Sequence, residues 1–301
     1  MSERPGSRSF AVAGHRIVPP ALDAGLYVVA TPIGNLGDIS LRALAILAAA
    51  DLIACEDTRV TAVLLRHYGI QAPLAAYHDH NADKQRPKLL EALAEGKSVA
   101  LVSDAGTPLV SDPGYKLVNA VRAAGHPVVP IPGASALLAG LVAAGLPTDT
   151  FLFAGFLPPK SAARVSRLKE LAAVPATLVF YETGPRLAAA LADMAEVLSA
   201  DRPATVAREL TKAFETVRTG TLGTLAETYA AENPPKGEIV VLVGPPLAEA
   251  PSVADADQLL VELLSDKPLS QAVAEAATLT GLKRRDLYQR ALALKNGDDG
   301  K

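Results

Sequence analysis

The feature that most constrains this chain is a regular alternation of short β-branched segments with segments rich in alanine and leucine. From Leu26 onward, the β-branched segments are LYVVA, DLIAC, SVALVS and PVVPIP, while SLRALAILAAA and ASALLAGLVAA have the length and composition of helices. Strands that alternate with helices are joined by crossover connections, which place the strands parallel in one sheet. The first half of the chain is therefore predicted to be α/β.

A second set of strand-like segments follows the proline- and glycine-rich stretch GLPTDTFLFAGFLPPK, which suggests a domain boundary. These segments are FLFAGF, ATLVFYE, ATVARE, ETVRTG and EIVVLVG, and helical stretches lie between most of them. The residues of ETVRTG alternate as in a strand with one face in water. We expect a second α/β domain with a mixed sheet.

The C-terminal residues predict a small helical unit. DADQLLVELLSD is one amphipathic helix, and LSQAVAEAATLTGLKRRDLYQRALAL has the spacing of a helix-turn-helix. Ser270 is the expected N-cap of its first helix, and Gly281 should end that helix in a left-handed conformation. The predicted organisation is a flexible tail (1–24), an N-terminal α/β domain (25–148), a second α/β domain (149–247) and a helical unit (255–301).

Composition limits the possible cellular settings. The 301 residues carry a net charge of −3, and Cys55 is the sole cysteine, so a disulfide framework and a thiolate metal cluster are excluded. The N-terminal residues lack the apolar core of a signal peptide, and the longest apolar run is shorter than the roughly 20 residues that span a bilayer. We expect a cytoplasmic protein.

The turn after the first strand, TPIGNLGDIS, approaches a dinucleotide fingerprint without matching it. The register of G-x-G-x-x-G falls on Pro32, Gly34 and Gly37. Pro32 fixes its own φ, and Asp38 adds negative charge beside the helix start, where a pyrophosphate would lie. These residues predict a neutral or cationic ligand and argue against an NAD oxidoreductase.

Two further strand-to-helix loops are rich in glycine and proline. SDAGTPLVSDPGY is longer than a usual crossover loop, and Asp112 and Pro113 are the expected N-cap and first residue of the next helix. PGASA places small residues at the start of another helix, which allows either close approach of a ligand or tight packing of the helix on the sheet.

The order of these motifs resembles the tetrapyrrole-methylase superfamily of S-adenosylmethionine-dependent methyltransferases. The resemblance runs from Leu26 to about Gly244, through TPIGNLGDIS, LIACEDTR, YHDHN, LVSDAGTPLVSDPG, PGASA, AGLP, GFLP, FYE, ARELTK and KGE. The EDTR and HDHN motifs resemble those of one branch of this superfamily. Members of that branch methylate the ribose 2'-hydroxyl of a cytidine in small-subunit (16S) rRNA.

The resemblance implies two α/β domains with the cofactor cleft between them, and a homodimer. It also implies contacts with S-adenosylmethionine from residues of both domains: Pro32, Gly34, Thr107, Pro108, Leu109, Ser135, Ala136, Tyr181 and Leu210.

A ribose hydroxyl is a weak nucleophile, so a base or a hydrogen-bond acceptor for its proton would help. The candidate acids are Glu56, Asp57, Asp104, Glu182 and Glu209. Glu182 and Glu209 are favoured, as base or substrate-orienting groups, because each closes a strand of the second domain. The alternative for every one of these acids is solvation or pairing with a nearby arginine.

Basic residues predict the RNA contacts. Two basic runs, at 160–169 and 283–295, have the character of phosphate-binding stripes, although each could be a solvated helix face. His78 and His80 lack a third ligand for zinc, so we expect a substrate-contacting loop and no metal. The predicted RNA-binding residues are Arg59, His78, His80, Lys160, Arg164, Arg186, Lys212, Lys283, Arg284 and Arg285.

Two other functions remain open at this point. One is methylation of a tetrapyrrole or corrin precursor, which the basic C-terminal unit disfavours. The other is a non-enzymatic RNA-binding factor for ribosome assembly, which would have kept the cofactor cleft.

Overall fold

The computed structural model describes residues 8–111, 114–247 and 253–298. The chain divides between Pro246 and Leu247 into a large unit and a small C-terminal unit, which are described separately. Within the described residues, no helix is long and apolar enough to cross a membrane.

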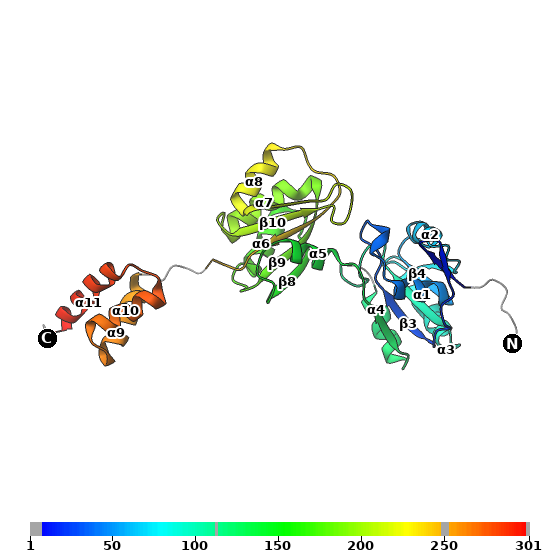
Figure 1. Cartoon of the computed structure of the whole chain (residues 1–301), viewed down its shortest axis with the longest axis horizontal. Helices are drawn as coiled ribbons and strands as arrows, with labels where there is room; N and C mark the ends of the chain where they lie inside the picture. The colour runs from blue at the N-terminus through cyan, green and yellow to red at the C-terminus, as the bar shows by residue number, and fades with distance from the viewer. Residues whose placement is uncertain (1–7, 112–113, 248–252, 299–301) are drawn as a thin grey trace. The chain divides into compact units, whose positions relative to one another are not determined.

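The first domain of the large unit contains a parallel five-stranded sheet, as predicted (Figure 1). The strand order is β5-β4-β6-β3-β7. The strands are β3 (Gly25–Val29), β4 (Leu52–Cys55), β5 (Leu74–Ala76), β6 (Ser98–Val102) and β7 (Val128–Ile131). The sequence pattern missed β5, because three residues are too few to show a period.

Helices cover both faces of this parallel sheet. Alternate residues of each strand point to opposite faces, and two apolar clusters result: one beneath α1 and α2, the other beneath α3 and α4. The helices of this domain are α1 (Leu41–Ala49), α2 (Thr58–His67), α3 (Ala82–Ala94), α4 (Tyr115–Ala123) and α5 (Ala136–Ala143), with a short 3-10 helix η1 (Leu36–Asp38).

The sequence predicted that the helix after β6 begins at Asp112 and Pro113. Those two residues lie outside the described ones, and α4 begins at Tyr115 with Gly114 at the N-cap.

The prediction of a flexible tail over residues 1–24 is wrong for its middle part. Strands β1 (Phe10–Val12) and β2 (His15–Ile17) form an antiparallel hairpin. Its two turn residues, Ala13 and Gly14, both have positive φ, as a tight hairpin turn requires. Phe10 is buried against the cluster beneath α1, so apolar burial holds the hairpin on the domain. Residues 1–7 lie outside the described ones.

The second domain has the mixed sheet that the sequence predicted, in the order β11-β10-β12-β9-β8. Only β8 and β9 pair in parallel among these neighbours. The strands are β8 (Phe151–Phe156), β9 (Thr177–Thr183), β10 (Pro203–Arg208), β11 (Thr216–Thr221) and β12 (Glu238–Val243). One face packs on α6 (Ser161–Leu171), α7 (Gly184–Leu198) and α8 (Leu222–Ala231), and the other face packs on α5.

The C-terminal unit consists of α9 (Val253–Asp266), α10 (Leu269–Thr280) and α11 (Arg284–Asp298) around a small apolar core. Gly281 ends α10 with φ 68°, which confirms the predicted left-handed cap. The prediction of Ser270 as N-cap is wrong, because α10 starts at Leu269, with Pro268 at the N-cap.

Candidate active site

Three loops meet at the carboxyl edge of the parallel sheet, because β6, β3 and β7 are neighbours in it. Backbone hydrogen bonds in both directions join Thr31, after β3, to Gly106, after β6, at 2.9 and 3.1 Å. The Thr107 hydroxyl donates to the carbonyl of Ala134, after β7, at 3.1 Å. The glycine and proline pairs therefore shape loops that are bonded to one another, and Gly106 has φ 80° within them.

A cavity of about 290 Å³ opens at these loops and is lined by residues of both α/β domains. The first domain contributes loop residues such as Thr107 and Ser135, and the second contributes the ends of β9, β10 and β12. Small side chains form much of the wall, and no Lys or Arg is found among the described lining residues. We call this space the first cavity.

A second cavity of about 380 Å³ shares Ile33, Asp104, Ala105 and Glu238 with the first. Its walls include apolar side chains of η1 and α2, such as Leu36, Val60 and Val63, the loop after β3, and the side chain of Lys212. Two cavities that share wall residues can hold two reactants side by side, and the shared wall carries two carboxylates.

The N-terminus of α5 is held from the second sheet. The backbone N–H of Leu137 donates to the Tyr181 hydroxyl at 3.1 Å, and the side chain of Ser135 makes no cap hydrogen bond. Tyr181 also stacks edge-on against Phe153 and Phe156 of β8. Tyr181 thus holds the start of α5 against the sheet of the second domain, at the wall of the first cavity.

Comparison with known proteins identifies this architecture. Residues 25–226 match the family model of tetrapyrrole (corrin/porphyrin) methylases, and residues 250–295 match the RsmI C-terminal HTH domain. The chain belongs to the tetrapyrrole methylase family.

Curated relatives extend over nearly the whole chain. A ribosomal RNA small subunit methyltransferase I of Mesorhizobium japonicum is 58% identical over 93% of this chain and 96% of its own length. The protein of the same name from Escherichia coli O157:H7 is 50% identical over 89% of this chain and 94% of its own length.

Solved structures share the fold at lower identity. The cobalt precorrin-4 methyltransferase CbiF has a TM-score of 0.56 at 18% identity, over 73% of this chain and 94% of that one. A uroporphyrin-III C-methyltransferase of Thermus thermophilus, complexed with S-adenosyl homocysteine, has a TM-score of 0.51 at 21% identity, over 73% and 97%.

The structure of this methylase brings five of the nine expected cofactor contacts together around the first cavity: Thr107, Ser135, Ala136, Tyr181 and Leu210. Pro32 and Gly34 line the second cavity instead. Pro108 and Leu109 line neither, and Leu109 packs on the core beneath α3 and α4. The role of all nine as cofactor contacts stays a prediction.

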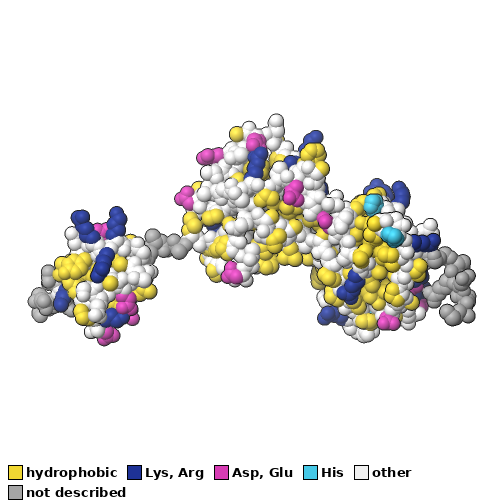
Figure 2. Space-filling view, viewed as in Figure 1, with side chains coloured by type: hydrophobic (Ala, Val, Ile, Leu, Met, Phe, Trp, Pro, Cys, Tyr) yellow, Lys and Arg dark blue, Asp and Glu magenta, His cyan; other side chains and the backbone are white. Residues whose placement is uncertain are grey.

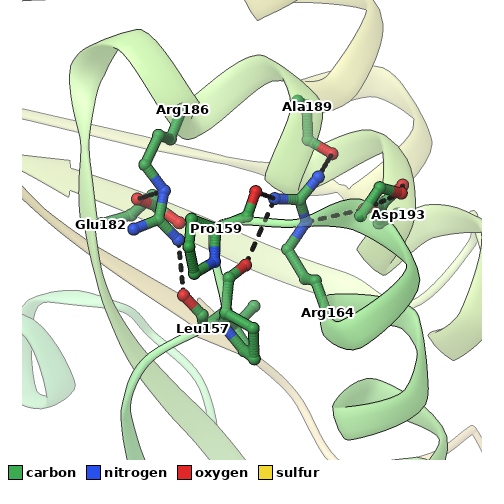
Figure 3. A network of polar contacts seen from close by, with 9 residues as sticks. Leu157, Pro159, Arg164, Glu182, Arg186, Ala189 and Asp193 are labelled. Atoms are coloured by element: carbon green, nitrogen blue, oxygen red, sulfur yellow. Dashed lines mark hydrogen bonds and ion pairs between the residues drawn. The ribbon is translucent and has the colours of Figure 1, made fainter.

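Glu182 lines the first cavity, but its carboxylate is paired with an arginine, and its role as a base stays a prediction. It follows Tyr181 in β9, and the strand pleat directs its side chain to the face covered by α7. There its Oε1 lies 3.2 Å from Arg186 Nε, and Arg186 also donates to the carbonyl of Leu157 at 2.5 Å (Figure 3). The alternative of pairing with an arginine is confirmed for Glu182.

Glu209 is paired as well. The Lys212 ammonium lies 2.7 Å from Glu209 and 2.6 Å from Glu238. The hydrogen bond from Lys212 and that from the Glu238 N–H lower the pKa of Glu209. Although burial alone would lower it, the bonds to both glutamates raise the pKa of Lys212. Two carboxylates already compensate the positive charge of Lys212, so little of that charge is available to an RNA phosphate. The structure therefore does not support the prediction that Lys212 binds RNA.

Two arginines predicted to bind RNA serve the fold instead. Arg164 is 4% exposed, its Nε lies 2.6 Å from Asp193, and it donates to the carbonyls of Pro159 and Ala189 (Figure 3). The prediction for Arg164 is therefore wrong, because the helix face that carries it packs inward. Arg186 is occupied by Glu182 and Leu157, as described above.

The other basic candidates lie at or near the surface of their own units. Arg59 is exposed and pairs with Asp57; His80 and Lys160 are exposed, and His78 is half-buried. Lys283, Arg284 and Arg285 are exposed at the turn and first residues of α11. Figure 2 shows Lys and Arg side chains on the C-terminal unit. Their contact with RNA stays a prediction.

Sequence reasoning missed Glu238 as a residue of the site. Glu238 stands in the KGE motif, whose glycine, Gly237, has φ 98° and packs on Glu209. The sequence signal for Glu238 was its position directly after a glycine and at the first residue of a predicted strand. In the described part of the chain, no cluster of three or more His, Cys, Asp and Glu side chains is suited to a metal.

Proposed function

We propose that this protein transfers a methyl group from S-adenosylmethionine to the ribose 2'-hydroxyl of a cytidine in 16S rRNA. The observation that carries the proposal is the pair of adjoining cavities, in a chain 58% identical to a relative named ribosomal RNA small subunit methyltransferase I. A methyl transfer between two bound molecules needs two sites in contact with each other, and the shared wall provides that.

The first cavity fits the donor. S-adenosylmethionine supplies a methyl carbon that is activated by a positively charged sulfur. Asp104 edges the cavity, and the described lining lacks Lys and Arg, so the local charge suits a cation and disfavours a pyrophosphate. The small residues Gly106, Ser135 and Ala136 permit close approach of the nucleoside to the backbone.

The second cavity fits the acceptor nucleoside. Its apolar walls on η1 and α2 can pack against a base that has been turned out of its stack, as enzymes acting on single nucleotides require. Holding the acceptor oxygen beside the methyl carbon in this way can lower the barrier by about 7–11 kcal/mol.

The C-terminal unit supplies the positive charge that RNA needs. The exposed side chains of Lys283, Arg284 and Arg285 stand together at the start of α11, in the part that matches the helix-turn-helix domain. Contacts between such side chains and phosphates provide sequence-independent affinity.

We further propose a homodimer and a cytoplasmic location, where the rRNA substrate is found. Hydrophobic side chains gather over α5 and β8 (Figure 2), and Leu138, Val142, Phe151 and Phe156 are 51%, 79%, 41% and 52% exposed. Apolar surface of this kind on a helix and an edge strand is typical of protein interfaces. Sedimentation equilibrium tests the dimer, and a monomer at micromolar concentration contradicts it.

The test of the activity uses S-adenosylmethionine labelled in its methyl group, with 30S particles, free 16S rRNA or a precorrin as acceptor. Label should enter rRNA at a 2'-oxygen, located by resistance of the neighbouring phosphodiester to alkali. Label in the porphyrinoid and none in rRNA would contradict the proposal in favour of a tetrapyrrole substrate. RNA binding with no transfer to any acceptor would indicate an assembly factor.

A further inference from the structure

The wall shared by the two cavities contains two ionisable residues, Asp104 and Glu238. A group at this wall faces both the donor and the acceptor, so it is placed where the bond between them forms. The two carboxylates differ in what they already bind, and that difference separates their roles.

Glu238 is neutralised by Lys212, at 2.6 Å. Glu182 and Glu209 are paired in the same way, and Asp57 pairs with Arg59. Asp104 makes no ion pair with any of the described residues. Glu56 also makes no ion pair among the described residues, but it lines neither cavity. Asp104 is therefore the candidate acid that is unpaired at the cavity wall.

The orientation of Asp104 is fixed by the loops around it. Its Oδ1 accepts the backbone N–H of Asp57 at 3.0 Å, at the N-terminus of α2, where the helix dipole favours an anion. The preceding residue, Ser103, donates to the carbonyl of Gly106, whose backbone is bonded to Thr31. The second oxygen, Oδ2, has no hydrogen-bond partner in the described part of the chain.

We propose that Asp104 is the catalytic residue that accepts the proton of the acceptor hydroxyl; this rests on the proposed methyl transfer to a ribose. The hydroxyl oxygen forms a bond to the methyl carbon with its lone pair. The carbon–sulfur bond breaks, and its electron pair stays on sulfur, which becomes a neutral thioether. The hydroxyl proton goes to Asp104 Oδ2, and the resulting carboxylic acid later releases it to water.

The first test is Asp104→Asn, measured by single-turnover methylation of 30S particles or rRNA, whichever the wild type methylates. The amide oxygen can still accept the Asp57 N–H, so the loop should keep its shape while the proton acceptor is lost. We expect the rate of transfer to fall by about 10²–10⁴-fold, with affinity for S-adenosylmethionine changed less than threefold by calorimetry. The matched control is Asp83→Asn, an exposed acid on α3, which should leave the rate unchanged.

The second test reads the contact without any transfer. A synthetic fragment of small-subunit rRNA that the wild type methylates is made with 2'-OH or 2'-H at the methylated position, and its affinity is measured without donor. The wild type should lose about fivefold or more on removal of the hydroxyl, and Asp104→Asn should lose less than twofold.

Full transfer activity of Asp104→Asn, or the same loss of affinity in both proteins, would overturn the role of Asp104 and leave the methylation itself established. A wild type that methylates no rRNA would instead overturn the proposed function. The two failures are therefore distinguishable.

Discussion

At the scale of single residues, the buried guanidinium groups of Arg164 and Arg202 both donate to backbone carbonyls. Arg202 is 1% exposed and donates to the carbonyls of Gly244, at 2.6 Å, and Ala172, at 3.2 Å. It has no carboxylate partner among the described residues, and burial lowers its pKa. Because Ala172 follows the last residue of α6, the cation also lies at the negative end of a helix dipole.

Arg202→Met should lower the free energy of unfolding by about 2–4 kcal/mol, because two buried carbonyls lose their donors. Urea unfolding measures the loss. The comparison is Arg218→Met, whose exposed pair with Glu232 should contribute at most about 1 kcal/mol. Equal losses of unfolding free energy for the two substitutions would show that burial does not determine how much each arginine contributes to stability.

Glu209 gives the protein a specific acid sensitivity. Its pKa is lowered in the folded state, so its pairing with Lys212 stabilises the fold at neutral pH and is lost as the pH falls through that lowered value. The difference in unfolding free energy between the wild type and Glu209→Gln should be about 1 kcal/mol at pH 7 and shrink as the pH falls below the ordinary titration range of a glutamate. A difference that grows on acidification would contradict this sign.

At the scale of elements, the turn after β3 and the loop after β10 are fitted to each other. Gly34 has φ 146°, and a Cβ atom built on it would lie 2.4 Å from Cε of Lys212. Glu209 and Thr211 in the facing loop are non-glycine residues with positive φ, a strained conformation that persists only when its surroundings hold it.

Gly34→Ala should therefore displace Lys212, change the wall of the second cavity and reduce rRNA methylation at least tenfold. Gly14→Ala is the control, because Gly14 also has a positive φ but has nothing within 4 Å of its would-be Cβ. Both variants should lose roughly 1 kcal/mol of stability from backbone strain, and only Gly34→Ala should lose activity. The methylation rate per folded molecule separates a loss of activity from a loss of stability.

Elements with a clear period were predictable, and contacts made across the fold were not. The β-branched runs predicted four strands of the parallel sheet. ETVRTG predicted β11, although β11 is exposed along nearly its whole length and not on one face alone. Strand β5 and the β1–β2 hairpin escaped because they are three residues long and stable only through packing, as with Phe10. Arg164 was misassigned, and the ion pair of Glu182 with Arg186 was not foreseen, because a sequence does not show which side of a helix or strand faces the core.

At the scale of the whole molecule, the C-terminal unit is separable. It has its own core, formed by Leu260, Val273, Leu287 and their neighbours, and an ion pair between Arg290 and Asp257 joins α11 to α9. The lining of both cavities comes entirely from the large unit. Affinity for RNA and affinity for the donor should therefore depend on different parts of the chain.

Deletion of the residues after Pro251 should weaken RNA binding and flatten its salt dependence, because each lost phosphate contact reduces the slope of log K against log salt by about 0.7–0.9. Affinity for S-adenosylmethionine should stay within about twofold. Replacing Lys283, Arg284 and Arg285 by alanine should reproduce most of the effect, whereas the exposed Lys84, Lys88 and Lys116 should not. Lost donor binding with intact RNA binding would contradict this division.

The acidic rim of the first cavity also bears on turnover. The donor enters with a positive sulfur and leaves without it, so Asp104 attracts the arriving donor more strongly than the departing product. We therefore expect the spent donor to bind more weakly than fresh donor, which favours its replacement.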